Sequence, residues 1–169
     1  FIDSANSSVQ VTDGILNIDV SSGFGSPQYI RRDSVFDTDL AVIQFRARVT
    51  RGPEQNFGFN SVIANLRWAA ESGQSGVPGQ LVLYVTEKRL TLRAVNSFDD
   101  RILPIDGTEF HTYSLLKNRD EDIRLFVDGA LAITIPFDEF GPIGGAAANP
   151  FLQIFEANQE TTTEWDFYR

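Results

Sequence analysis

Apolar and polar residues alternate with a period of two along most of this chain. The clearest case is residues 41–50, where every odd position is apolar and every even position except Val42 is polar. Because successive side chains of a β-strand point to opposite faces, this pattern predicts a strand with one buried and one exposed face. The same reasoning predicts strands over residues 15–20, 29–32, 62–68, 81–87, 90–95, 102–105, 110–116, 123–127, 130–135, 151–155 and 163–168.

Glycine- and proline-rich segments separate the expected strands. They lie at residues 23–27, 52–53, 73–79 and 141–150. None of them has the length of a domain linker, and no helical period extends beyond two turns. A chain of 169 residues is long enough to bury one substantial core. We therefore expect a single all-β domain over residues 1–169, built as a two-sheet antiparallel jelly-roll sandwich.

The segment 110–129, FHTYSLLKNRDEDIRLFVDG, predicts a β-hairpin and carries a family likeness. A β-prone run is broken by the charged block Lys117–Asp122, resumes over Ile123–Val127, and ends in the tight-turn pair Asp128-Gly129. This order of residues resembles the central hairpins of concanavalin A-like jelly rolls. That superfamily includes laminin G-like domains, legume lectins, laminarinase-type glycosidases, polysaccharide lyases and several carbohydrate-binding modules.

Both ends of the chain extend the resemblance. Val11–Asp19, VTDGILNID, is an Asp-Gly turn followed by an alternating strand, as at the start of many family members. Glu164–Arg169, EWDFYR, is similar to the final strand of the laminarinase-like branch. The resemblance implies that the first and last strands pair side by side.

The charge balance disfavours two classes of partner. The net charge is −9 and the isoelectric point about 4.5, which disfavours nucleic acid and anionic membrane surfaces. No apolar run approaches the ~20 residues that cross a bilayer, so we expect no membrane insertion. Twelve of the fourteen cations are arginine, whose planar guanidinium suits carboxylates and sulfates.

The sulfur-containing residues are absent from the chain. Without cysteine there is no disulfide, thiol nucleophile or cysteine-bound metal. Without methionine, Phe1 is not a natural start, which indicates that a signal peptide was removed or that the domain was cut from a longer chain. We expect an exported protein of bacterial origin, extracellular or periplasmic.

The catalytic patterns of enzymes with this fold are missing. Retaining glycosidases of the family carry Glu-x-Asp-x-x-Glu along one strand, which gives a nucleophile and a proton donor on one face. The lyases carry Gln-Ile-His with a partner tyrosine. Neither pattern occurs here, and the single histidine, His111, is expected to have a packing or hydrogen-bonding role. An enzyme with an atypical site around Glu87, Glu156 and Tyr113 remains an alternative.

A sugar-binding face needs hydrogen-bond donors and an aromatic ring. In jelly rolls of this family the polar face of the curved sheet is the usual floor of the sugar cleft, which makes the concave sheet the expected site. The candidate binding residues are Gln44, Arg46, Arg48, Asn65, Arg67, Trp68, Tyr84, Arg93 and Gln153. The leading hypothesis is a non-catalytic, lectin-like domain that binds a polysaccharide or oligosaccharide. A laminin G-like protein-interaction domain is the third hypothesis.

Two ligand classes remain open for such a site. Arg46 and Arg48 share a strand face about 7 Å apart, so they are placed to engage successive carboxylates of a uronate polymer. A neutral β-glucan would instead stack on Trp68 or Tyr84.

One structural calcium ion is the only cofactor that the resemblance suggests. Laminarinase-like relatives hold calcium between the first loop and a carboxylate of the final strand. Asp166 corresponds to that carboxylate, and Asp3 and Gly23 are the candidate co-ligands. Oxygen ligands of this kind suit a hard cation.

Overall fold

The computed structural model describes residues 7–20, 29–33, 40–51, 62–68, 79–94, 100–118, 121–136, 139, 151–155 and 161–168. Thirteen strands lie within these ranges. They are β1 (Ser7–Thr12), β2 (Ile15–Val20), β3 (Tyr29–Asp33), β4 (Leu40–Arg51), β5 (Val62–Trp68), β6 (Gly79–Val85), β7 (Arg89–Ala94), β8 (Arg101–Pro104), β9 (His111–Asn118), β10 (Asp122–Val127), β11 (Ala130–Pro136), β12 (Phe151–Phe155) and β13 (Thr161–Tyr168). Within the same ranges, no helix has the length and apolar character needed to cross a membrane.

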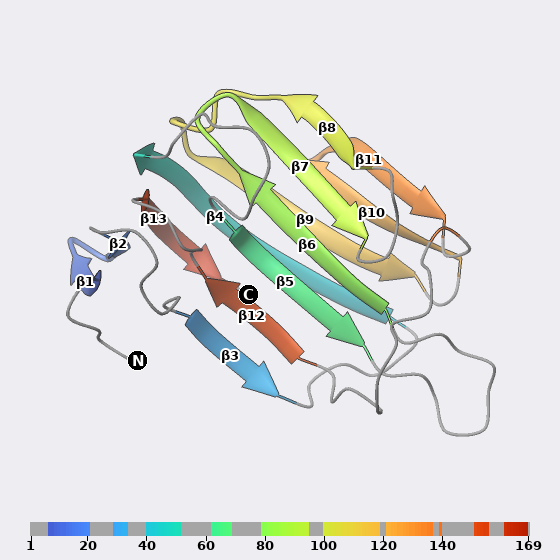
Figure 1. Cartoon of the computed structure of the whole chain (residues 1–169), viewed down its shortest axis with the longest axis horizontal. Coiled ribbons are helices and arrows are strands. Elements are labelled where there is room, and N and C mark those ends of the chain that lie inside the picture. Colours follow the sequence, from blue (N-terminus) through green and yellow to red (C-terminus); the bar gives the residue numbers. More distant parts are fainter. Residues whose placement is uncertain are drawn as a thin grey trace.

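The strands form two antiparallel sheets that lie face to face (Figure 1). Sheet A has seven strands in the order β1-β2-β13-β4-β9-β10-β11, and sheet B has six in the order β3-β12-β5-β6-β7-β8. The all-β two-sheet sandwich predicted from the alternation is therefore confirmed. β13 pairs with β2 along five residues, so the first predicted strand and the last one do lie side by side.

β1 is a strand that the hydrophobic pattern did not predict. Its sequence, SSVQVT, has too few apolar residues to show a clear period of two. It joins the sheet through the tight turn at Asp13 and Gly14, whose φ angles are 53° and 80°. Two successive positive φ angles match the right-handed twist of a hairpin, and an Asp-Gly pair adopts them readily. The turn thus places β1, a mostly polar strand, at the edge of sheet A.

The core lies between the sheets and follows the predicted alternation of β4. Ile43, Phe45, Ala47 and Val49 are all buried, and the even residues between them are partly exposed. Sheet B contributes the buried side chains Leu81, Leu83, Val85, Leu90 and Leu92 to the same cluster. In each sheet we call the face that points into this core the inner face, and the opposite one the outer face.

Gly107 ties the two sheets together at one end of the sandwich. It lies in the connection from β8 of sheet B to β9 of sheet A. Its N–H donates to the carbonyl of Glu87, at the β6–β7 turn, over 2.9 Å. Its carbonyl accepts from the N–H of Val49, on β4, over 2.8 Å. One residue therefore joins a hairpin of sheet B to a central strand of sheet A.

Residues at both ends of the charged block Lys117–Asp122, which was expected to break the β-prone run, belong to the strands. Lys117 extends β9 on its inward-facing side and is only 4% exposed. Asp122 begins β10 and accepts a 2.8 Å hydrogen bond from Arg124. The reason is that both residues continue the β9–β10 pairing, in which Asp122 lies opposite Asn118. Pairing of the backbone thus extends the hairpin through residues whose charge suggested a break.

Tyr113 has a buried hydroxyl group without a hydrogen-bond partner in the part of the chain that the structure describes. The side chain is fully buried beside Phe45, and this burial raises the pKa of the Tyr113 phenol. An unsatisfied buried polar group costs about 1–3 kcal/mol. We expect Tyr113→Phe to raise the free energy of unfolding by about 1 kcal/mol in urea denaturation. A loss of stability instead would mean that the hydroxyl has a partner.

Candidate functional site

The structure corrects the expectation that the nine candidate binding residues share one face. Three of them, Gln44, Arg46 and Arg48, lie on β4 of sheet A. The other six lie on strands of sheet B: Asn65, Arg67 and Trp68 on β5, Tyr84 on β6, Arg93 on β7 and Gln153 on β12. Because the sheets pack through their inner faces, the outer faces are on opposite sides of the molecule. Local alternation identifies a polar strand face but not the sheet to which it belongs.

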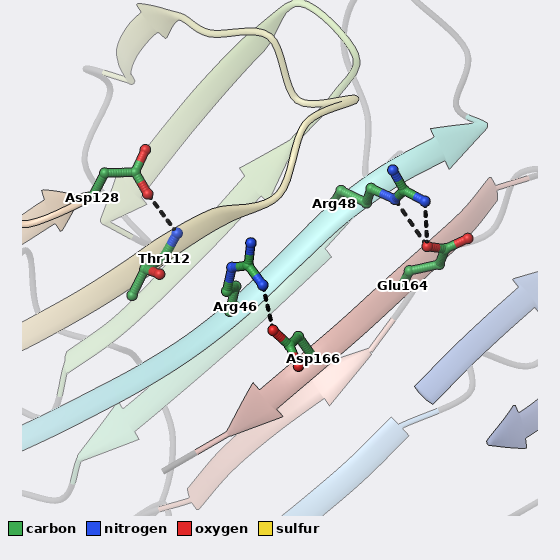
Figure 2. A network of polar contacts seen from close by, with 6 residues as sticks. All are labelled: Arg46, Arg48, Thr112, Asp128, Glu164 and Asp166. Atoms are coloured by element: carbon green, nitrogen blue, oxygen red, sulfur yellow. Dashed lines mark hydrogen bonds and ion pairs between the residues drawn. The ribbon is translucent and has the colours of Figure 1, made fainter. Parts of the chain in front are cut away.

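The two arginines of β4 are already paired with carboxylates. Figure 2 shows both side chains reaching from β4 to the neighbouring strand β13. Arg48 donates through Nε to Glu164 over 2.9 Å, and Arg46 forms an ion pair with Asp166. Both guanidinium groups also lie over the ring of Phe110, 4.6 and 4.9 Å from its centroid. The sequence predicted that these arginines would bind the carboxylates of a polymer. In the structure, each of them already has a carboxylate partner within the chain.

Asp166 owes its position to a β-bulge. Trp165 pairs with Ala47 and Phe167 with Arg46, so Asp166 is the extra residue between them. The bulge lets the carboxylate meet Arg46. Asp3 and Gly23, the other calcium candidates, lie outside the described residues. Within the described ranges, no three His, Cys, Asp or Glu side chains cluster in a way that would hold a metal ion. Calcium binding thus stays a prediction from the resemblance.

His111 joins two turns at the same end of sheet A. Its Nδ1 lies 2.6 Å from the Asp128 carboxylate, and its Nε2 lies 2.9 Å from the carbonyl of Asp106. The hydrogen-bonding role expected for this histidine is confirmed. Both partners can only accept, so the two contacts coexist when both ring nitrogens carry hydrogens. Asp128 also accepts from the backbone N–H of Thr112 over 2.9 Å (Figure 2).

These hydrogen bonds make the stability contributed by Asp128 depend on pH. Burial alone would raise the pKa of the Asp128 carboxyl, but the hydrogen bonds from His111 and Thr112 outweigh it and lower that pKa below 3.8. A lowered carboxyl pKa stabilises the fold above the unfolded-state value, and this contribution is lost as the pH falls. We expect Asp128→Asn to be less stable than the wild type at pH 6, with the gap closing between about pH 5 and pH 3. Thermal melts of both proteins across this range measure the gap, and a gap that widens in acid would contradict the assignment.

The outer face of sheet B carries a row of residues in register across five strands. Arg31 pairs with Gln153, Gln153 with Asn65, Asn65 with Val82, and Val82 with Arg93. Val82 is outside the core cluster, whereas its neighbours Leu81 and Leu83 are in it, which places the row on the outer face; Val82 itself is only 5% exposed, so the centre of the row is covered. Three of the predicted binding residues, Asn65, Arg93 and Gln153, are therefore brought together. Arg67 occupies the adjacent row, opposite Phe151.

Arg93 is the best-defined polar group on this face. Its Nε and one terminal nitrogen donate to the two carboxylate oxygens of Asp100, over 2.7 and 2.6 Å. The guanidinium group also lies over the ring of Tyr84, 5.5 Å from the centroid. The hydrogen bond from Arg93 lowers the pKa of Asp100, and the same bond raises the pKa of Arg93. Burial raises the pKa of Tyr84, so its phenol stays protonated at neutral pH.

No protein-family model matches the chain, and no curated protein sequence matches it significantly. Solved structures do match over nearly its whole length. A carbohydrate esterase from the Shiga toxin-encoding bacteriophage phi24B has a TM-score of 0.66 at 13% identity, covering 98% of this chain and 86% of its own. An alginate lyase from Pseudomonas aeruginosa has a TM-score of 0.60 at 12% sequence identity, covering 99% of this chain and 86% of its own. A laminarinase from Flavobacterium sp. UMI-01 has a TM-score of 0.61 at 17% sequence identity, covering 98% of this chain and 81% of its own. The chain has a concanavalin A-like jelly-roll fold.

The two predicted stacking residues, Tyr84 and Trp68, occupy different sides of sheet B. Arg93 already lies over the ring of Tyr84. Trp68 shares the strand parity of Leu66, and Leu66 pairs with the buried Leu81. Register therefore places Trp68 on the inner side of β5, opposite to Arg67. Besides Tyr84, register places the aromatic positions Tyr29, Phe151 and Phe155 of the described strands on the outer face.

Two residues of the alternative enzyme site, Glu87 and Tyr113, lie on different sheets. Tyr113 is fully buried in the core of the jelly roll, on sheet A. Glu87 lies at the β6–β7 turn of sheet B, and Glu156 is outside the described residues. A tyrosine enclosed between two sheets cannot contact a polysaccharide, so Tyr113 is not available to the alternative site.

Sequence reasoning missed Asp100, which completes the best-defined contact of the outer face. A signal for it was present. Arg93 lies near the end of the predicted strand 90–95, and Asp100 lies just before the next predicted strand, 102–105. Residues on either side of a hairpin loop are cross-strand neighbours, so an acid and a base at these positions are expected to pair.

Proposed function

We propose that this domain is a non-catalytic carbohydrate-binding module that holds its glycan on the outer face of sheet B. The observation that carries the proposal is the register row across β12, β5, β6 and β7, in which Gln153, Asn65 and Arg93 occupy positions on the same side of the sheet. Amide and guanidinium groups are the donors that sugar hydroxyl and carboxylate groups need. The proposal is supported by structural neighbours whose names are alginate lyase, laminarinase and carbohydrate esterase.

The carboxylates of the same face argue for binding without hydrolysis. Two aspartate positions belong to the outer face of sheet B in the described part of the chain. They are Asp33, on β3, and Asp100, just before β8. These two strands are the opposite edges of the sheet, five strand spacings or about 24 Å apart. Glycosidases need two carboxyl groups within about 5–10 Å. Asp100 is also bound by Arg93, so it is poorly suited to donate a proton.

Affinity electrophoresis tests this proposal on the intact domain. Gels containing laminarin, alginate or no polysaccharide are compared for the wild type, Arg93→Ala on sheet B and Arg124→Ala on the outer face of sheet A. We expect retardation by at least one polymer, loss of it in Arg93→Ala, and no change in Arg124→Ala. Reducing-end and unsaturated-product assays are expected to stay at the buffer level. Equal loss in both variants, or product release, would contradict the proposal.

Failure of every polymer to retard the domain favours the laminin G-like alternative. That hypothesis predicts a protein ligand. No contact among the described residues indicates which kind of protein it would be.

A further inference from the structure

Three Asp-Gly pairs occur in the chain, and all of them lie in connections between strands. They are Asp13-Gly14, Asp106-Gly107 and Asp128-Gly129. Aspartate followed by glycine can rearrange without an enzyme, because glycine has no side chain to shield its amide nitrogen. The three pairs share this sequence, so any difference in their reactivity comes from their surroundings.

The rearrangement passes through a cyclic succinimide. The glycine nitrogen attacks the side-chain carboxyl carbon of the aspartate and forms a C–N bond, while a carboxyl oxygen leaves as water together with the hydrogen of that nitrogen. Water then opens the ring. Opening at the main-chain carbonyl carbon returns the hydrogen to the nitrogen and gives isoaspartate, in which the chain continues through the former side chain. No oxidant or reductant is needed.

Two of the pairs have the same backbone conformation. Asp13 and Gly14 have φ angles of 53° and 80°, and Asp128 and Gly129 have φ angles of 51° and 80°. Nothing lies within 4 Å of a Cβ built on either glycine. Backbone geometry and crowding around the nitrogen therefore do not distinguish these two turns, and the contacts of the aspartate side chain do.

The Asp128 carboxylate is held through both of its oxygens. One oxygen lies 2.6 Å from Nδ1 of His111, and the other accepts from the N–H of Thr112 over 2.9 Å. The carboxyl group must leave both partners before it can meet the nitrogen of Gly129. The same hydrogen bonds lower the pKa of Asp128, although burial opposes them. An ionised carboxylate reacts poorly, because its oxygen leaves as water only after gaining a proton.

Asp106-Gly107 is protected on both reacting groups, although Asp106 is exposed. The Asp106 carboxylate accepts from the N–H of Thr108 over 3.1 Å and from its hydroxyl group over 2.5 Å. The hydrogen bond from the Thr108 side chain is the main cause that lowers the pKa of Asp106. The attacking nitrogen of Gly107 donates to the carbonyl of Glu87 over 2.9 Å. Exposure of the aspartate alone therefore does not decide reactivity.

Asp13 lacks every one of these restraints. It is exposed, and in the part of the chain that the structure describes its carboxylate has no hydrogen bond or ion pair. We propose that Asp13-Gly14 is a site of spontaneous isoaspartate formation, and that the contacts of Asp106 and Asp128 protect the other two pairs. A carboxylate that must break hydrogen bonds of this kind reacts at least about tenfold more slowly than a free one.

Isoaspartate at this position would release β1 from sheet A. The rearranged residue adds one carbon atom to the main chain of a two-residue turn, whose length sets the register of the hairpin. β1 pairs with β2 alone, over six residues from Ser7↔Val20 to Thr12↔Ile15. β2 keeps its second partner, β13. We therefore expect the modification to detach the edge strand and to leave the rest of the sandwich folded.

The experiment compares ageing of the folded domain with ageing of the same chain unfolded in urea. Trypsin then separates the three pairs onto the peptides Phe1–Arg31, Ile102–Lys117 and Leu125–Arg169. Isoaspartate in each peptide is measured by isoaspartyl methyltransferase labelling and located by fragmentation in a mass spectrometer. We expect Asp13 to react at least about tenfold faster than the other two in the folded domain, and all three to react at comparable rates in urea.

His111→Ala is the matched variant, because it removes a contact of Asp128 and leaves Asp13 untouched. It is expected to accelerate isoaspartate formation at Asp128 and not at Asp13, with melting curves to check that it is folded. The comparison of folded and unfolded wild type stands without this variant. Equal rates at the three pairs in the folded domain, no isoaspartate at Asp13, or an unchanged Asp128 rate in folded His111→Ala would overturn the proposal.

Discussion

Gly107→Ala is expected to lower the free energy of unfolding by about 3 kcal/mol, or roughly 6–12 °C in melting temperature. A Cβ atom at this position would lie 2.0 Å from the backbone carbonyl oxygen of Thr86, far inside van der Waals contact. Backbone must move to relieve the clash, because the closest atom belongs to the backbone and not to the end of a flexible side chain. That movement strains the hydrogen bonds from Gly107 to Glu87 and from Val49 to Gly107, which join the two sheets.

Gly129→Ala is the control for this prediction. Gly129 has a φ angle of +80°, but nothing lies within 4 Å of the Cβ that it would gain. The cost there is conformational only, about 1–2 kcal/mol. Urea denaturation of both variants measures the difference. Similar losses of stability in the two would show that the close approach of Gly107 to Thr86 is absent in solution.

Phe45→Ala is expected to cost about 3–5 kcal/mol of stability. Phe45 is fully buried on the inner face of β4, and its ring lies 5.3 Å from that of Tyr113 and 5.4 Å from that of Trp165. Its truncation removes a large apolar side chain and leaves a cavity between three strands of sheet A that close packing cannot easily fill.

Val42→Ala on the same strand gives the comparison. Val42 lies on the outer face and is 59% exposed, so its truncation should change stability by less than about 0.5 kcal/mol. Guanidinium or urea unfolding of both variants, analysed with a common m-value, provides the measurement. A loss below 1 kcal/mol for Phe45→Ala would mean that β4 does not present this face to the core.

Local alternation was enough to predict the strands and the inner face of the core. β4 illustrates the reason. Its apolar residues occupy every odd position and therefore share one face, and Ile43, Phe45, Ala47 and Val49 are buried together when that face points into the core. β1 was not predicted, because the Asp13-Gly14 turn brings it into the sheet and its own composition gives no clear strand pattern.

The candidate site was harder to predict because it depends on topology. Arg46 and Asp166 are 120 residues apart in sequence and meet only because β13 pairs with β4 and carries a bulge. The face of Trp68 is decided by the register of β5 against β6, which includes a second irregularity between Val62 and Ala64. Pairing partners, sheet membership and bulges are long-range properties, whereas the period-two pattern is local.

The most direct test of the account is the face on which the glycan binds. Backbone amide resonances can be followed while alginate and laminarin oligosaccharides are added in turn to the isotope-labelled domain. If the glycan binds sheet B, shifts concentrate on β5, β6, β7 and β12, including Asn65, Val82 and Arg93, while Arg46 and Arg48 on β4 stay unchanged. Shifts centred on β4, β9 and β13, or no shift with either oligosaccharide, would contradict it.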